Sequence, residues 1–184
     1  MNKFSSAARW VGCLVLLLAA SAMFAVSGSA RDEQPAPGAR VQVTWAPLEQ
    51  LSEVKNNPPN RGWLRPQEWT QSIADHLRKS ADRILPPGQQ LRVHIDDISL
   101  AGRFEPLYRP GQQDARIMRE VYSPWMNLHF VLLAPDGTML REGDAKLRDA
   151  TYLRRAVAAN PSDPLRYDKR MIDDWLRREF GSER

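Results

Sequence analysis

Two histidines in the sequence have side chains able to bind a metal ion. His94 and His129 each fall on the polar side of a run of alternating apolar and polar residues. If the two runs form neighbouring strands, the imidazoles could meet a carboxylate such as Asp96 or Glu142 and bind zinc. A zinc site needs three or four converging ligands, and this spacing matches no metal signature. We therefore interpret both residues as half-exposed strand histidines.

Paired carboxylates could perform general acid and base chemistry, which often uses two acidic groups in different environments. The chain has two Asp-Asp doublets, Asp96-Asp97 and Asp173-Asp174. Adjacent residues of a strand point to opposite faces, so one member of the first doublet at most joins a common site. We interpret the first doublet as a bulge with one inward carboxylate, and the second as a solvated helix face.

Other catalytic signatures are absent from the sequence, which contains no G-x-S-x-G, no P-loop and no H-E-x-x-H. Arginines and lysines gather between Arg148 and Arg170, where they could contact an acidic partner or lipid head groups. Acidic residues, among them Asp149, Asp163 and Asp168, are interleaved with them. This mixture favours an internally paired surface.

Residues 101–113 contain two prolines and two glycines and are expected to form a long excursion between strands. Aromatic side chains flank the excursion and offer a large contact area. They form either a contact surface for a ligand or protein, or a lid folded onto the sheet, and both interpretations stay open. The binding residues predicted on the first interpretation are Asp97, Phe104, Tyr108, Arg116, Tyr122 and Trp125.

The amino-terminal segment has the layout of a signal peptide. Two basic residues precede an apolar run at residues 10–26, and the small residues Gly28 and Ala30 suit signal peptidase. The run is shorter than the ~20 residues that span a membrane. We expect a cleavable signal over residues 1–30 and a periplasmic location, with an uncleaved anchor as the alternative.

Loss of the signal would change the available chemistry. Cys13 is the only cysteine, so its removal excludes thiolate catalysis, thiolate metal sites and disulfides. Of the 26 basic residues, 24 would remain against 22 acidic ones, which lowers the formal charge from +4 to +2. Such a balanced surface gives no electrostatic reason to expect nucleic acid as a partner. The sequence also predicts no cofactor.

Alternating apolar and polar residues predict three strands, and a tight turn predicts a fourth. In the second of them the alternation breaks across Asp96-Asp97, which indicates a bulge. The third begins after Pro124, and a tight turn at residues 134–138 returns the chain as its antiparallel partner. The strands are expected at residues 41–45, 91–100, 125–133 and 139–147.

Two amphipathic helices complete the predicted fold. Apolar residues at four-residue spacing predict a helix over residues 67–83. A broad apolar stripe containing Trp175 predicts a final helix, for which Asp163-Pro164 would supply the N-cap and the first helical position. We expect a flexible leader at residues 31–39, then a single α+β domain at residues 40–184. In it, a mainly antiparallel sheet of about four strands packs against the two helices.

Four segments of the sequence carry a resemblance to a known family. They read VTWAPLEQLSEV, DDISLAG, DARIMREVYSPWMNLHF and YDKRMIDDWLRREF, and they lie in the family's order over nearly all of the chain after residue 40. In these segments the chain resembles the secreted proteobacterial proteins catalogued as domain of unknown function 3016. That family has no assigned activity or catalytic residues. The resemblance therefore implies export and one domain, but no mechanism.

The sequence favours a non-enzymatic binding or accessory domain of the cell envelope. Its partner would be an envelope protein or another envelope component, contacted through residues 101–125. The alternative is a small periplasmic hydrolase or metal-dependent enzyme that uses His94, Asp97 and His129. A third interpretation is a purely structural or stress-related envelope protein.

Overall fold

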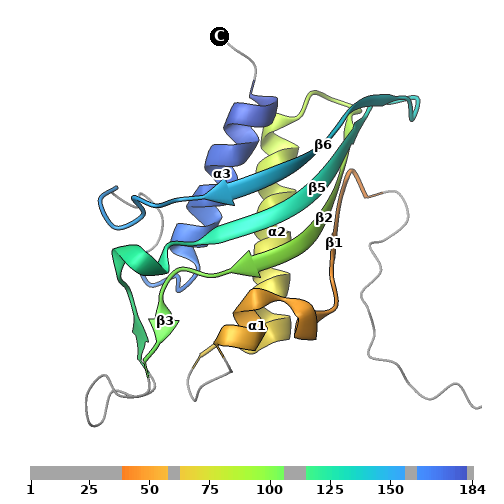
Figure 1. Cartoon of the computed structure of the whole chain (residues 1–184). Helices are drawn as coiled ribbons and strands as arrows, with labels where there is room; N and C mark the ends of the chain where they lie inside the picture. The colour runs from red at the N-terminus through yellow and green to blue at the C-terminus, as the bar shows by residue number, and fades with distance from the viewer. Residues whose placement is uncertain (1–38, 58–62, 106–114, 156–160, 182–184) are drawn as a thin grey trace, which may run out of the picture. The chain divides into compact units, whose positions relative to one another are not determined.

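The computed structural model describes residues 39–57, 63–105, 115–155 and 161–181. All of these residues belong to one compact unit, Gln34–Arg184 (Figure 1). The predicted signal peptide and all but the last residue of the predicted leader lie outside the described residues. No helix within the described ranges is long and apolar enough to cross a membrane.

A four-stranded sheet in the order β1-β2-β5-β6 forms the centre of the fold. β1 runs parallel to β2, whereas β2, β5 and β6 pair antiparallel. The predicted α+β class with a mainly antiparallel sheet is therefore confirmed. A second, two-stranded sheet pairs β3 with β4. The strands are β1 (Val41–Trp45), β2 (Gln90–Ser99), β3 (Arg103–Phe104), β4 (Arg116–Ile117), β5 (Trp125–Leu133) and β6 (Met139–Arg148).

The predicted bulge in β2 is present. Ile95 pairs with Leu128, the next partners are Asp97 and Asn127, and the register shifts between them. The tight turn between β5 and β6 is also confirmed, because Gly137 adopts a φ of 86° and its N–H donates to the carbonyl of Ala134 at 2.9 Å. A positive φ of this size favours glycine.

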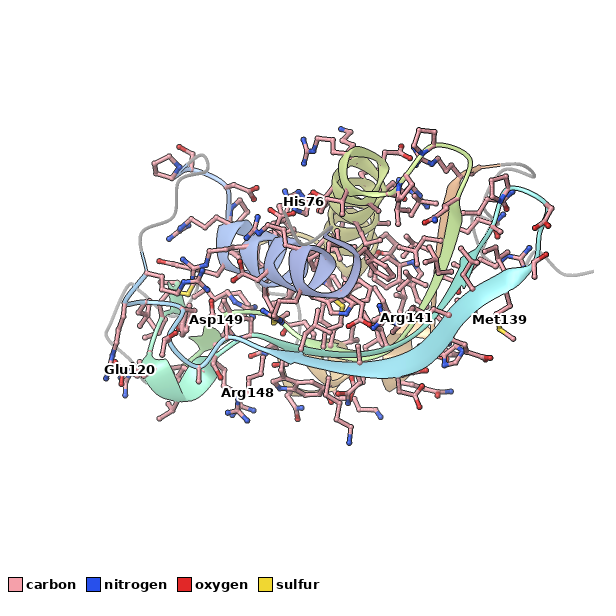
Figure 2. All side chains as sticks on the ribbon, turned by 90° about the horizontal axis from the view of Figure 1, so that it is seen from above. His76, Glu120, Met139, Arg141, Arg148 and Asp149 are labelled. Atoms are coloured by element: carbon pink, nitrogen blue, oxygen red, sulfur yellow. The ribbon has the colours of Figure 1, made fainter. Side chains whose placement is uncertain are left out.

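Helices α2 (Pro66–Ile84) and α3 (Arg166–Phe180) cover one face of the sheet, and the other face is open (Figures 1 and 2). The first is the helix predicted over residues 67–83, with one more residue at each end. Short helical turns precede and follow: η1 (Leu48–Gln50), α1 (Ser52–Asn56) and η2 (Glu120–Tyr122). These turns are too short to show a helical period, so the sequence analysis missed them.

The core lies between the helices and the inner face of the sheet. Trp175 of α3 is 3 % exposed, and its ring meets Phe130 of β5 edge-on at a centroid distance of 5.8 Å. Phe180 contacts both rings, at 5.5 and 5.6 Å. The apolar stripe predicted for the last helix therefore packs as expected.

The predicted start of the last helix is wrong. α3 begins at Arg166 with Leu165 at the N-cap, so Asp163 and Pro164 stand before the helix. The Asp163 carboxylate accepts the Leu165 N–H at 2.9 Å and the Lys169 ammonium at 2.7 Å. An aspartate that accepts a backbone N–H two residues onward stabilises a turn, and this turn takes the place of the predicted first helical residues.

The interpretation of Asp173-Asp174 as a solvated face is also wrong. Asp173 is bonded to His76 at 2.8 Å and accepts the Ser80 hydroxyl at 2.7 Å, which ties α3 to α2. Burial alone would raise the pKa of Asp173, but these two hydrogen bonds lower it. The side chain of Asp174 is 13 % exposed and pairs with Arg155 and Arg177. Both carboxylates are used to hold elements together.

Candidate functional site

Residues 101–105 and 115–124 form an arm that leaves the sheet after β2 and returns to it at β5 (Figure 1). Gly102 starts the arm with a φ of 82°, and its N–H donates to the Tyr122 carbonyl at 2.9 Å. A Cβ at this position would lie 2.6 Å from the Met118 sulfur. Only glycine fits this tight turn, which brings the two halves of the arm together.

A buried ion pair fixes the base of the arm. Arg116 of β4 donates to both carboxylate oxygens of Glu53 in α1, at 2.7 and 3.2 Å. The two side chains are only 2 % and 3 % exposed. The same guanidinium donates to the carbonyls of Ala101 at 2.7 Å and Leu100 at 3.1 Å, where the chain leaves β2. One arginine thus holds together the short helix, the end of β2 and the arm.

Two aromatic rings flank the Arg116 guanidinium. Its central carbon lies 4.9 Å from the ring centroid of Trp63 and 5.5 Å from that of Phe104. The rings meet each other edge-on at 5.9 Å. Attraction between a cation and ring faces strengthens when water is excluded, so the rings stabilise the charge that the arm buries.

Asp168 of α3 is the second carboxylate of this buried cluster. It is 1 % exposed, and its Oδ1 accepts the Ala101 N–H at 3.0 Å. Its Oδ2 is buried without a hydrogen-bond partner among the described residues. Burial raises the pKa of Asp168 to about 7, against the hydrogen bond from Ala101 and the positive charge of Arg116. This carboxyl group is therefore partly protonated near neutral pH.

A small hollow lies beside the ion pair. Its lining includes Glu53, Asn57, Trp63 and Trp69, and it has room for one water molecule at most. Asn57 donates to Glu53 at 3.1 Å, while its Oδ1 and the Trp63 Nε1 are buried without partners in the described part of the chain. A hollow of this size is too small for an organic substrate.

The outer surface of the arm is polar with one prominent apolar side chain. Glu105 accepts the Arg119 guanidinium at 2.9 Å and the Tyr122 hydroxyl at 2.8 Å, and that hydrogen bond raises the pKa of Tyr122. Val121, which lies between Arg119 and Tyr122 in the sequence, is 75 % exposed. Beneath the arm, the buried Tyr152 hydroxyl donates to the Arg119 carbonyl at 2.8 Å.

A comparison with protein families identifies the chain. The family described as "Protein of unknown function (DUF3016)" matches residues 39–178, which include the sheet, the arm and nearly all of α3. The chain belongs to the DUF3016 family. No curated protein matches the DUF3016 chain significantly.

The DUF3016 arm brings together only part of the predicted binding set. Phe104 and Arg116 meet in the buried cluster, and Tyr122 lies on the outer surface. Trp125 begins β5 opposite Ser99 and Arg148, at the point where the arm rejoins the sheet. Tyr108 lies outside the described residues.

Asp97 is held by donors from α1 and from the backbone beside the bulge. Its carboxylate accepts the backbone N–H and the hydroxyl of Ser52, both at 2.7 Å, and the N–H of Ile98 at 2.8 Å. The Arg116 guanidinium pairs with Glu53 instead of with this carboxylate. Asp97 therefore fixes Ser52, the first residue of α1. The next residue, Glu53, anchors the arm.

The two strand histidines lie side by side on the open face of the DUF3016 sheet. His94 is the register partner of His129. His94 is bonded to Thr44 at 2.9 Å, and His129 to Asp144 at 2.9 Å and Glu142 at 3.1 Å. The bond with Asp144 raises the pKa of His129. Within the described ranges no group of three metal-binding side chains is found, and no interaction joins either histidine to Asp97.

Three members of the buried cluster carry no signal in the sequence. Glu53, Trp63 and Asp168 lie in separate segments of the chain and meet around Arg116 and Ala101 only in the fold. Glu53 and Asp168 are charged residues in helices, which on sequence grounds are expected in solvent. The role of the cluster is structural, since all three guanidinium nitrogens of Arg116 donate to described acceptors at the base of the arm.

Proposed function

We propose that this chain is an exported domain of the cell envelope that binds another envelope component through the outer surface of its arm, without catalysing a reaction. The observation that carries the proposal is Val121, which is 75 % exposed on an arm whose base is held by a buried ion pair. Export is supported by the signal-like pattern of residues 1–30.

Rigidity at the base of the arm favours binding. A preorganised surface loses less conformational entropy when a partner docks. The Arg116–Glu53 pair and the Tyr152 hydrogen bond fix the arm from below, so Val121 is presented from an ordered backbone.

An ion pair joins the two chain segments that carry the exposed apolar side chains. Glu120, next to Val121, accepts Arg154 at 2.9 Å, and the neighbouring Leu153 is 38 % exposed. Two apolar side chains beside a charged pair give the combination of apolar centre and polar rim that protein interfaces use. A protein partner with a small apolar projection and mixed charge fits this surface.

In-cell crosslinking tests the proposal. A photo-reactive amino acid replaces Val121, and the matched control places it at Lys79, an exposed residue of α2. We expect a discrete crosslinked species from position 121, identified by mass spectrometry as an envelope component, and none from position 79.

Two results would contradict the proposal. The first is an identical crosslinking pattern from both positions, which would show random contact. The second is turnover of a substrate by the purified chain that is abolished by changing His94 or His129, which would favour the enzyme interpretation instead.

A further inference from the structure

β6 is an edge strand of the four-stranded sheet. It pairs with β5 along one side only, and in the described part of the chain no strand pairs with the other. The strand is ten residues long, Met139–Arg148, and Met139 and Leu140 at its start are 57 % and 51 % exposed. Half of the backbone N–H and C=O groups of an edge strand point away from the sheet, so a long edge is a template for a further strand.

The side chains of β6 alternate between the two faces of the sheet. Leu147 is 3 % exposed, and Ala145 packs against the core beneath the helices. The residues between and beside them are charged and point to the open face, as Figure 2 shows for Arg148. In chain order these open-face charges are Glu142, Asp144, Lys146 and Arg148.

We propose that the free edge of β6 pairs antiparallel with β6 of a second copy of this chain, with the two Ala145 residues opposite each other. In this register Glu142 faces the partner's Arg148, and Asp144 faces the partner's Lys146. Two-fold symmetry repeats both contacts, so four oppositely charged pairs form. The edges are complementary because the sequence places two acidic residues before Ala145 and two basic residues after it.

Neighbouring registers are less favourable. In a symmetric antiparallel pairing, residues directly opposite each other must lie on the same face of the sheet. The nearest alternative registers therefore move the symmetry centre by one residue, from Ala145 to Asp144 or to Lys146. Centred on Asp144, the pairing opposes two aspartates, and centred on Lys146 it opposes two lysines. Like charges directly opposite destabilise a strand pair. The charges therefore favour one register. Edge strands that resist association also carry charged side chains, but those charges have no complementary partners across the edge.

Charge reversal tests the pairing directly. The chain is purified from cells, its amino terminus is determined by mass spectrometry, and its dimer dissociation constant is measured by sedimentation equilibrium. Lys146→Asp places two aspartates opposite each other at two symmetric positions, so we expect dimerisation to weaken roughly tenfold. Lys79→Asp, with the same charge change on α2, is the control and should leave the constant unchanged.

A mixing experiment makes the test independent of folding defects. Asp144→Lys and Lys146→Asp should each weaken self-association, yet an equimolar mixture should form a heterodimer within about threefold of wild-type affinity, because all four pairs are again opposite in charge. Circular dichroism verifies that each variant is folded. A wild-type chain that stays monomeric, a dimer unaffected by Lys146→Asp, or no heterodimer in the mixture would each overturn the proposal.

Discussion

Asp97 is a residue whose environment follows from one irregularity of the sequence. The bulge between Ile95 and Asp97 turns this side chain toward α1, where Ser52 donates two hydrogen bonds to it. Asp96, its neighbour, is exposed. The doublet that suggested acid–base chemistry therefore divides into one structural carboxylate and one solvated carboxylate.

Alanine substitutions separate these two roles. Asp97→Ala leaves the Ser52 and Ile98 donors unmet, so the free energy of unfolding should fall by roughly 1 to 3 kcal/mol, whereas Asp96→Ala should change it by less than about 0.5 kcal/mol. Urea denaturation of both variants measures the difference. Equal stability of the two would show that the Ser52 contacts contribute nothing.

The raised pKa of Asp168 predicts how the stability of the fold changes with pH. Burial raises the pKa of Asp168 from 3.8 to about 7. A carboxyl group with a raised pKa stabilises the fold in its protonated form, so its contribution is complete below pH 3.8 and is lost as the pH rises to about 7. Asp168→Asn cannot ionise and keeps an acceptor for Ala101. Its stability relative to wild type should therefore increase from pH 4 to pH 7 and then level off.

The matched control for this effect is Asp163. Burial opposes ionisation there too, but the bond from Lys169 prevails and lowers the pKa of Asp163. A lowered pKa contributes stability above the unfolded pKa that is lost as the pH falls. Asp163→Asn should thus be less stable than wild type at pH 7 and approach it in acid. Denaturant midpoints measured from pH 4 to pH 8 test both, and a pH-independent difference for Asp168→Asn would contradict the assignment.

At the scale of elements, α3 shows how one helix connects the fold. Its apolar face packs on the sheet through Trp175, and its polar residues reach α2 through Asp173 and the arm through Asp168. Periodicity predicted the apolar contact, since the stripe is a local pattern. The polar contacts depend on which elements lie alongside, and no local pattern carries that information.

Truncating the central aromatic residue of α3 tests its packing. Trp175→Ala removes the contacts with Phe130 and Phe180 and should cost on the order of 3 to 5 kcal/mol. Trp175→Phe keeps an aromatic ring and removes an indole N–H that is buried without a described partner, so it should cost less than about 1.5 kcal/mol. Chemical denaturation measures both variants, and an unchanged midpoint for Trp175→Ala would refute the packing.

For the whole molecule, the proposed export makes a direct prediction. The chain recovered from the periplasmic fraction should begin at Arg31 and fail to react with thiol reagents, because Cys13 leaves with the signal. Fractionation followed by amino-terminal sequencing checks both points. Full-length chain in the membrane fraction would instead support the uncleaved anchor.

The local architecture of this protein could be predicted from its sequence alone. Alternation located β1, β2 and β5, the tight turn at residues 134–138 located β6, the break at Asp97 located the bulge, and the helical spacing located α2 and α3. These features were readable because side-chain periodicity reports which face of an element is buried. The segments resembling DUF3016 likewise predicted the family.

Which distant side chains meet depends on the three-dimensional fold. It placed Arg116 against Glu53, made Asp168 a buried carboxyl group, and set β6 at the edge of the sheet. A charged residue becomes tolerable inside a protein when a partner arrives from elsewhere in the chain, and linear spacing does not encode that encounter. Strand order likewise depends on long-range pairing. The position of β6 at the edge of the sheet, and the exposure of its charge pattern there, could therefore not be predicted from the sequence.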